Sequence, residues 1–208
     1  MIKETIQATL NKTGKGKIFF ITDPHFGHIN LCKAIRGMTA EESDNLIIKN
    51  WNSVVKSPYD TVYIGGDLTM EKPQLFERVI SKLNGRKVII GGNHDDRKSC
   101  ELYQRLGITI MGCLEYKGYI FTHIPILKSE VKHYRGNIHG HIHTYELPSY
   151  KYINMTADLN GMMPRTLDYI IAKQRSKKSL KSYLYLTYKL ILRNLKHKTK
   201  KKKWKLNI

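Results

Sequence analysis

The densest group of potential metal ligands in this chain lies in the segment from Asn137 to His143. It contains His139, His141 and His143, spaced two residues apart. Neutral imidazole is a common metal ligand near neutral pH, and alternate side chains of an extended segment point to the same side. The spacing therefore predicts a metal site. The alternative interpretation of so short a motif is a solvated surface cluster of histidines.

Further potential ligands follow four other apolar segments of the chain. They are Asp23 and His25 after residues 17–22, Asp67 after 60–66, Asn93 after 86–92, and His123 after 117–122. Each segment is rich in β-branched or aromatic residues, which predicts a buried strand. Ligands in α/β proteins gather outside the carboxyl ends of strands, so these side chains are expected to converge. Packing alone explains them poorly, because buried carboxylates and imidazoles are costly unless they are paired or bind metal.

The number and type of these side chains indicate two metal ions. A catalytic zinc ion typically has three protein ligands and one open position, fewer than the chain supplies. Two divalent cations about 3.5–4 Å apart are a common device for in-line displacement at phosphorus. The mixture of oxygen and nitrogen ligands suits manganese, iron, zinc or nickel, and it disfavours calcium or a magnesium-only site.

The segments between the strands predict helices that cover the sheet. Residues 30–56 place apolar side chains at helical spacing, with a break near Gly37. A second helix is expected from about Pro73 to Leu83, with proline in its first turn. His28 and Arg36 are harder to explain as core residues. They either contact a substrate phosphate or lie on the surface.

Positive charge is concentrated at the C-terminal end of the chain. The 208 residues carry a formal net charge of +19, and residues 171–208 contain fourteen Lys and Arg but no Asp or Glu. This length and charge distribution predict one domain, residues 1–171, followed by a basic amphipathic tail, residues 172–208.

The remaining composition predicts a cytoplasmic protein, or one of the host cytoplasm if it is viral. Cys32, Cys100 and Cys113 form no Cys-x-x-Cys pattern, so we expect reduced, mostly buried thiols. We also expect no signal peptide and no membrane-spanning segment, because no apolar run is long enough.

Together these features resemble the calcineurin-like metallophosphoesterase superfamily. The motifs that carry the resemblance, in order, are Asp23-x-His25, Gly66-Asp67, Gly92-Asn93-His94-Asp95, Thr122-His123 and Gly140-His141-x-His143. The match covers about residues 17–170 and is most similar to small bacterial and phage members. It implies an α/β fold, a sandwich of two mixed β-sheets flanked by helices, with the site at the strand ends. To this fold the composition adds a basic C-terminal tail that is helical or disordered.

The resemblance also implies a ligand set for each metal ion. Asp23, His25 and His143 would hold one ion, and Asn93, His123 and His141 would hold the other, with Asp67 bridging them. We expect two divalent transition-metal ions, manganese first, with iron, zinc or nickel as alternatives.

Residues around the ligands would handle the substrate. The predicted catalytic residues are His94 and Asp67. His94 would hydrogen-bond the phosphate or protonate the leaving oxygen. The substrate would also contact Asn93, His28 and Arg36. Asp95 would orient His94. The resemblance assigns no role to His139, which we interpret as a packing or supporting residue.

The implied activity is phosphoester hydrolysis by metal-activated water. Gly66-Asp67 is followed by Leu-Thr-Met-Glu-Lys72 rather than by the Asp-Arg-Gly of the superfamily's protein phosphatases, and the capping domain of its double-strand-break nucleases is absent. We therefore predict a phosphodiesterase that acts on a nucleotide or nucleic-acid ester. The alternatives are a small phosphomonoesterase and a non-catalytic nucleic-acid- or membrane-binding module on the same scaffold.

The tail has three interpretations, among which charge alone does not choose. Lysines such as Lys200 to Lys203 would bind nucleic-acid phosphates, with stacking by Tyr183, Tyr185, Tyr188 and Trp204. One helix face, made of Leu180, Leu184, Tyr188, Ile191 and Leu195, would instead suit an anionic membrane or a partner. Otherwise the tail packs on the domain and ends in a disordered lysine run.

Overall fold

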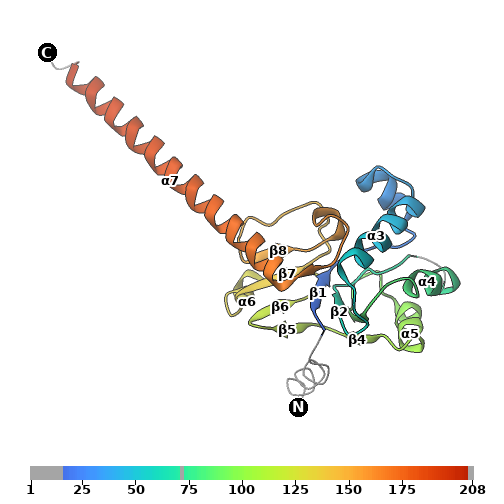
Figure 1. Cartoon of the computed structure of the whole chain (residues 1–208). Helices are drawn as coiled ribbons and strands as arrows, with labels where there is room; N and C mark the ends of the chain where they lie inside the picture. The colour runs from blue at the N-terminus through green and yellow to red at the C-terminus, as the bar shows by residue number, and fades with distance from the viewer. Residues whose placement is uncertain (1–15, 71–72, 206–208) are drawn as a thin grey trace.

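The computed structural model describes residues 16–70 and 73–205, and it contains two β-sheets with helices around them (Figure 1). The five-stranded sheet has the order β4-β3-β2-β1-β9, and the four-stranded sheet has the order β5-β6-β7-β8. Both sheets are mixed. The predicted fold, a two-sheet α/β sandwich flanked by helices, is confirmed.

The first sheet is parallel except at one edge. It consists of β1 (Ile18–Ile21), β2 (Thr61–Ile64), β3 (Arg86–Ile90), β4 (Thr109–Met111) and β9 (Arg165–Thr166), of which only β9 pairs in antiparallel fashion. In the second sheet β5 (Leu114–Tyr116) is antiparallel to β6 (Tyr119–Phe121), whereas β6, β7 (Gly136–His139) and β8 (Tyr152–Asn154) are parallel. The carboxyl ends of β1, β2 and β3 therefore share one edge, as do those of β6 and β7.

Alternation along β1 shows how the apolar strands build two cores. Phe19 and Ile21 point to the core under the helices, whereas Phe20 points between the two sheets. There the Phe20 ring meets Phe121 of the second sheet edge to face, at 5.4 Å between centroids. A strand buried on both faces needs apolar residues at successive positions, which explains the unbroken apolar run in the sequence.

Helices cover the outer face of the first sheet. They are α2 (Ile29–Leu31), the π-helical turn η1 (Cys32–Arg36), α3 (Ala40–Val54), α4 (Pro73–Ile80) and α5 (Arg97–Arg105). The predicted break is confirmed, since Gly37 ends η1 in a left-handed conformation with φ 67°. Thr39 then caps α3 with a capping box to Glu42.

The last helix, α7 (Leu167–Lys205), begins against the body and then leaves it (Figure 1). Short α6 (Lys128–Val131) and the 3₁₀ turn η2 (Ala157–Leu159) complete the described helices. Within the described residues no helix combines the length and apolar character that crossing a bilayer requires. The predicted domain boundary at 171/172 falls inside α7 and stays a prediction.

One expectation about the cysteines is wrong. Cys32 is buried, but Cys100 is only partly buried and Cys113 is exposed, so the thiols are not mostly buried. All of them are free, as expected.

Candidate metal centre

The loops after the strands hold their polar residues in strained conformations. Asp23, His25, Asp67, His141 and His143 all have positive φ values, between 45° and 69°. Only two other non-glycine residues of the described chain, Lys117 and Met162, share this feature. Such conformations cost of order 1–3 kcal/mol each and persist where the surrounding structure holds them, which is typical of functional sites. The strain therefore marks these strand ends as a candidate site.

The first cluster of ligand-type side chains brings together residues that lie far apart in the sequence. Asp23, His25 and His143 each offer an atom within 4.8 Å of the others. Asp23 and His25 follow β1 and are almost fully buried, and His143 lies beyond the end of β7. The ring centroids of the two histidines are 5.2 Å apart and nearly stacked. This is the first of the two predicted groups.

The second cluster consists of Asp67, His123 and His141, again with ligand atoms within 4.8 Å of one another. His123 Nδ1 lies 2.8 Å from the Gly65 carbonyl oxygen. A proton on Nδ1 donated to that carbonyl leaves Nε2 with a free lone pair, the form that a metal ligand needs. His123 Nε2 lies 3.5 Å from Asp67 Oδ2 and 2.8 Å from Oδ1 of Asn93.

Asp67 lies between the two clusters. Its Oδ2 atom is 3.5 Å from His123 Nε2 and 3.7 Å from His25 Nε2, so one oxygen faces a histidine of each cluster. The other oxygen, Oδ1, accepts a hydrogen bond from the backbone N–H of His94 at 2.9 Å. This fixed carboxylate has the position that a bridging ligand requires.

The buried groups of the centre are incompletely satisfied by protein alone. Neither ring nitrogen of His25 has a hydrogen-bond partner among the described residues, although the side chain is 1% exposed. Burial lowers the pKa of His25 to about 3, which keeps the imidazole neutral. Burial also raises the pKa of Asp23 to about 6, against the opposing effect of His123. A neutral imidazole and a carboxylate short of positive charge suit a bound cation, so these residues fit divalent metal ions.

His94, Asn93 and His28 lie at the more open side of the centre. The His94 side chain is 42% exposed, and its Nε2 atom is 4.0 Å from Asp67 Oδ2. His28 Nδ1 accepts a hydrogen bond from the Leu31 N–H, and its ring centroid is 5.3 Å from that of His25 and 6.4 Å from that of His94. These side chains are therefore more accessible than the buried residues of the two clusters.

Arg36 does not have the predicted position. Its side chain is only 1% exposed, and its Nε donates to Asp158 at 2.7 Å. The other guanidinium nitrogens donate to Ser43 Oγ and to the carbonyl oxygens of Pro24 and Asp23. All three guanidinium nitrogens thus donate to protein groups of the loop after β1, α3 and η2, and the predicted contact with substrate is corrected to a structural role.

The predicted contact of Asp95 is also corrected. Its carboxylate accepts hydrogen bonds from the N–H groups of Asp67 and Gly92 and from the hydroxyl of Tyr103, at 2.8–2.9 Å. Among the described residues these groups, rather than the ring of His94, are its close partners. Asp95 therefore holds the loops after β2 and β3 together, and it supports Asp67 directly.

The histidine run does not follow the expected alternation. β7 ends at His139, which is fully buried against the ring of Tyr152, as expected of a packing residue. His141 and His143 come after the strand in left-handed conformations and enter different clusters. Their convergence on the site results from turns, not from an extended segment.

Asp158 is the functional candidate that the sequence interpretation missed. Its carboxylate lies 2.9 Å from His143 Nδ1 and 2.7 Å from Arg36 Nε. Burial alone would raise the pKa of this carboxyl, but the bonds from His143 and Arg36 outweigh burial and lower it. The one sequence signal for Asp158 is its place between the apolar residues Ala157 and Leu159, which indicates burial. A buried carboxylate needs a partner, so such a residue is a candidate for a defined role.

Asp158→Asn is expected to weaken metal binding by about 10–100-fold, the usual effect of losing a carboxylate that orients a ligand histidine. The variant keeps the shape of the side chain but removes the charge that holds Nδ1 of His143. Titration of metal into the chelator-treated protein measures the effect. Asp168→Asn, at the start of α7, is the matched control, and equal affinities in all three proteins would contradict the role.

The loops of the two sheets meet at Gly140. A Cβ atom at this position would overlap Oδ2 of Asp23 and crowd the side chain of Thr22. Two backbone N–H groups reinforce the contact, because Gly140 donates to the His123 carbonyl oxygen and His141 donates to the Asp23 carboxylate. Only glycine allows this close approach.

Gly140→Ala is expected to destabilise the fold by about 1–3 kcal/mol, the usual cost of overpacking, and to weaken metal binding by displacing Asp23. Gly91→Ala is the control, because a Cβ there would meet nothing within 4 Å. Thermal unfolding and metal titration of both variants measure the difference. An unchanged Gly140→Ala protein would show that the loops have more room than the structure indicates.

Comparison with known proteins agrees with this geometry. A family model described as calcineurin-like phosphoesterase matches residues 16–189. The uncharacterised protein MJ1445 of Methanocaldococcus jannaschii is 34% identical over 168 residues, which cover 74% of this chain and 89% of the relative.

Two solved structures are similar to parts of this chain. The protein of unknown function AQ665 from Aquifex aeolicus has a TM-score of 0.61 and 26% identity, over 76% of this chain and 99% of its own. The nuclease MPE of Pseudomonas putida has a TM-score of 0.44 and 18% identity, over 61% of each chain. Since the family model spans most of the chain and the site offers two groups of metal-ligand side chains, this chain belongs to the calcineurin-like phosphoesterase family and is a metal-dependent phosphoester hydrolase.

Proposed function

We propose that this protein is a phosphodiesterase with two metal ions, which hydrolyses a nucleotide or nucleic-acid ester. The observation that carries the proposal is the place of Asp67 Oδ2, which faces His25 of one cluster and His123 of the other. In this proposal Asp67 would bridge the two ions. One ion would be held by Asp23, His25 and His143, and the other by Asn93, His123 and His141. Manganese is the proposed metal.

The bound ions would lower the pKa of a water and neutralise charge on the phosphoryl oxygens. The residues of the chain would provide the geometry. Asp67 is held by its bond from the His94 N–H and by the support of Asp95, so it needs little rearrangement during the reaction. Asp158 keeps His143 oriented. No side chain is required as a covalent nucleophile.

His94 would act on the substrate itself. Its ring is partly exposed at the open side of the centre, and its Nε2 atom faces Asp67 Oδ2 at 4.0 Å. An imidazole in this place can donate a hydrogen bond to a phosphoryl oxygen or a proton to the leaving oxygen. Asn93 and His28 lie beside it and would contact the same substrate.

His94→Ala is expected to lower the hydrolysis of bis-p-nitrophenyl phosphate with Mn²⁺ by about 10²–10⁴-fold, the usual contribution of a general acid. His133→Ala, an exposed histidine on the segment after α6, is the control and should leave the rate unchanged. Comparison with p-nitrophenyl phosphate tests the diester preference. Faster cleavage of the monoester would identify a phosphomonoesterase, and no turnover of either ester by the metal-loaded wild type would indicate a binding module.

The basic residues of α7 are proposed to bind a polyanion. Residues 171–208 contain no acidic side chain to oppose their lysines and arginines. Lys200 to Lys203 and the side chains of Tyr183, Ile191, Leu195 and Trp204 lie outside the described side chains, so the predictions made for them stay predictions.

A further inference from the structure

Helix α7 has two parts with different surroundings. In the first part, Gln174 accepts a hydrogen bond from the Tyr119 hydroxyl and donates to the Arg135 carbonyl oxygen, both at 2.8 Å. Lys173 donates to the Asn154 carbonyl oxygen at 3.0 Å, and Lys177 pairs with a carboxylate at 3.0 Å.

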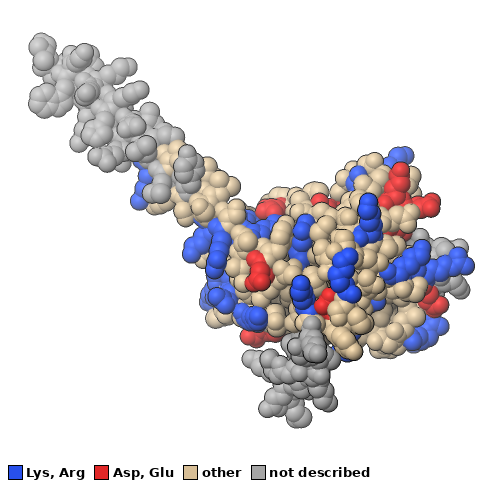
Figure 2. All heavy atoms as spheres, viewed as in Figure 1, with Lys and Arg blue, Asp and Glu red and all other residues tan. Residues whose placement is uncertain are grey.

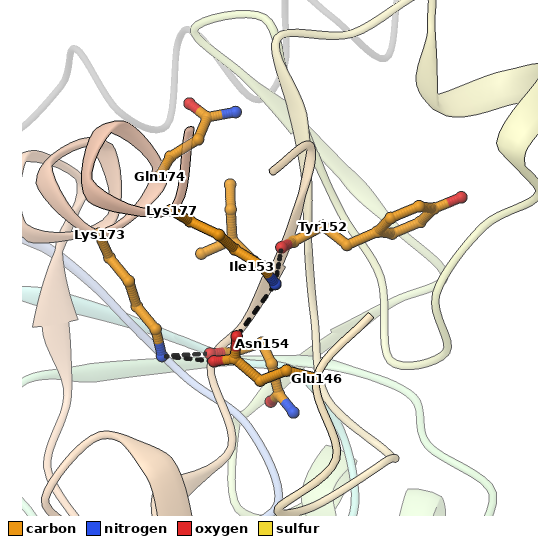
Figure 3. Close-up of a pocket in the computed structure, with 7 residues that line it drawn as sticks. All are labelled: Glu146, Tyr152, Ile153, Asn154, Lys173, Gln174 and Lys177. Atoms are coloured by element: carbon orange, nitrogen blue, oxygen red, sulfur yellow. Dashed lines mark hydrogen bonds and ion pairs between the residues drawn. The ribbon is translucent and has the colours of Figure 1, made fainter. Parts of the chain in front are cut away.

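Figure 3 shows Lys173 and Lys177 of α7 facing β8 and Glu146, whose carboxylate forms an ion pair with the ammonium group of Lys177. Lys178 adds a contact, with its ammonium group 5.4 Å from the centroid of the Tyr150 ring. Together these contacts attach the start of the helix to the body.

Beyond Lys177 the helix carries apolar side chains that the body does not cover. Figure 1 shows this part of α7 extending away from both sheets. Leu180, Leu184 and Tyr188 are 58–59% exposed and four residues apart, so they line one face of the helix. In the sequence, Ile191 and Leu195 follow at spacings of three and four residues, which are also helical spacings. Such a face is normally buried against something, because a helix is stabilised mainly by packing its apolar side.

The charge of the helix restricts what can cover this face. Lys178, Lys181 and Lys189 are exposed around it, and basic side chains are visible on the part of α7 nearest the body in Figure 2. Because residues 171–208 have fourteen basic and no acidic residues, a second copy of the helix would place like charges side by side. The complementary surface must therefore be negative as well as apolar.

An anionic lipid surface is both negatively charged and apolar, whereas a nucleic acid offers negative charge but no apolar surface for leucine side chains. Leucine has no ring to stack on a base, so nucleic-acid binding leaves the apolar face of Leu180 and Leu184 unexplained. At a bilayer surface, leucine and tyrosine enter the interface while long lysine side chains reach the headgroups. We infer that the part of α7 beyond Lys177 lies on an anionic lipid surface, with Leu180, Leu184 and Tyr188 facing the lipid.

This arrangement would place the phosphoesterase domain at the membrane. From Lys178 to Lys205 the helix is about 42 Å long, at 1.5 Å per residue, which allows an extended contact in the plane of the membrane. Because α7 is one continuous helix whose first part is attached to the body, the membrane-bound part would hold the body close to the membrane. The inference goes beyond the proposed phosphodiesterase activity and does not depend on it.

Vesicle flotation of the full chain tests the inference. The wild type is expected to float with vesicles of phosphatidylcholine and phosphatidylglycerol, and not with phosphatidylcholine alone. The triple variant Leu180→Gln, Leu184→Gln, Tyr188→Gln keeps every charge and should bind anionic vesicles at least about tenfold more weakly, because it loses apolar burial. The matched variant Lys178→Gln, Lys181→Gln, Lys189→Gln should also bind less, and its residual binding should be less sensitive to salt.

A single-stranded oligonucleotide, assayed in parallel, distinguishes the rival polyanion. If oligonucleotide binding is purely electrostatic, the triple variant Leu180→Gln, Leu184→Gln, Tyr188→Gln should bind the oligonucleotide as well as the wild type does. The inference is overturned if the wild type does not float with anionic vesicles, or if the apolar triple variant floats as well as the wild type. Thermal unfolding shows whether each variant is folded, and neither flotation nor unfolding requires catalysis.

Discussion

Asp67→Asn is expected to lower kcat/KM for bis-p-nitrophenyl phosphate by at least about a thousandfold, because it removes the charge shared by both clusters. The amide oxygen of asparagine can still accept the bond that the N–H of His94 donates to Oδ1. The loop geometry is therefore kept, and the loss reports the charge of the bridging group rather than a collapse of the site.

Asp60→Asn is the matched control. Asp60 precedes β2 and Asp67 follows it, and both carboxylates are buried and accept backbone N–H groups. Only Asp67 faces the clusters, so Asp60→Asn should affect stability while kcat/KM at a permissive temperature is retained. Equal losses in the two variants would mean that a buried carboxylate matters here for folding alone, and the two-metal proposal would fail.

Removal of bound metal is expected to abolish hydrolysis and to lower the thermal stability of the protein. A metal ion at a hundred times its Kd contributes about 2.7 kcal/mol by binding only the folded state. For a chain of this size that corresponds to a fall in Tm of about 5–10 °C on chelation. Readdition of Mn²⁺ should restore both properties, and iron, zinc and nickel can be compared in the same assay.

The stoichiometry separates the two clusters. Elemental analysis of the manganese-loaded wild type is expected to give about two ions per chain, because each cluster has its own ligands. His25→Ala and His123→Ala each remove a ligand from one cluster and should each retain about one ion, whereas His133→Ala should retain both. A Tm that does not change on chelation, together with metal-free protein after loading, would contradict the proposal.

Local patterns in the chain predicted the strands that end in polar residues, β1, β2, β3, β6 and β7, but did not predict β4, β5 and β8. β1, β2 and β3 are short apolar runs that stop at Asp23, Gly65 and Gly91, and a run buried on both faces is recognisable without knowledge of its neighbours. Parallel strands of one sheet bring such ends to one edge, so the proximity of Asp67 and Asn93 follows from strand type, whereas His123 follows a strand of the other sheet and depends on how the two sheets pack. The break of the first helical region at Gly37 is equally local.

Assignments that depend on distant partners were not available from local patterns. Arg36 looked like a phosphate-binding residue until the fold placed Asp158, 122 positions later, beside its guanidinium. Asp95 is adjacent to His94 in the chain, yet its carboxylate turns to the backbone of Asp67. Whether a charged side chain is used inside the protein or presented to substrate depends on which loops meet, and spacing along the chain does not encode that.

Residue types and spacing thus predicted the strand-end site and its seven candidate ligands, because periodicity and ligand chemistry are properties of short segments, and the resemblance of these motifs to a known superfamily implied the fold class. The folded chain alone showed that His141 and His143 reach their clusters through left-handed turns after β7, and that Asp158 lies beside His143. It also showed that the Asp67 carboxylate faces His25 of one cluster and His123 of the other, and that among the described side chains of α7 the contacts with the body extend to Lys178. These outcomes depend on left-handed turns and on contacts between the two sheets, which are energetically favourable only when the whole domain is assembled.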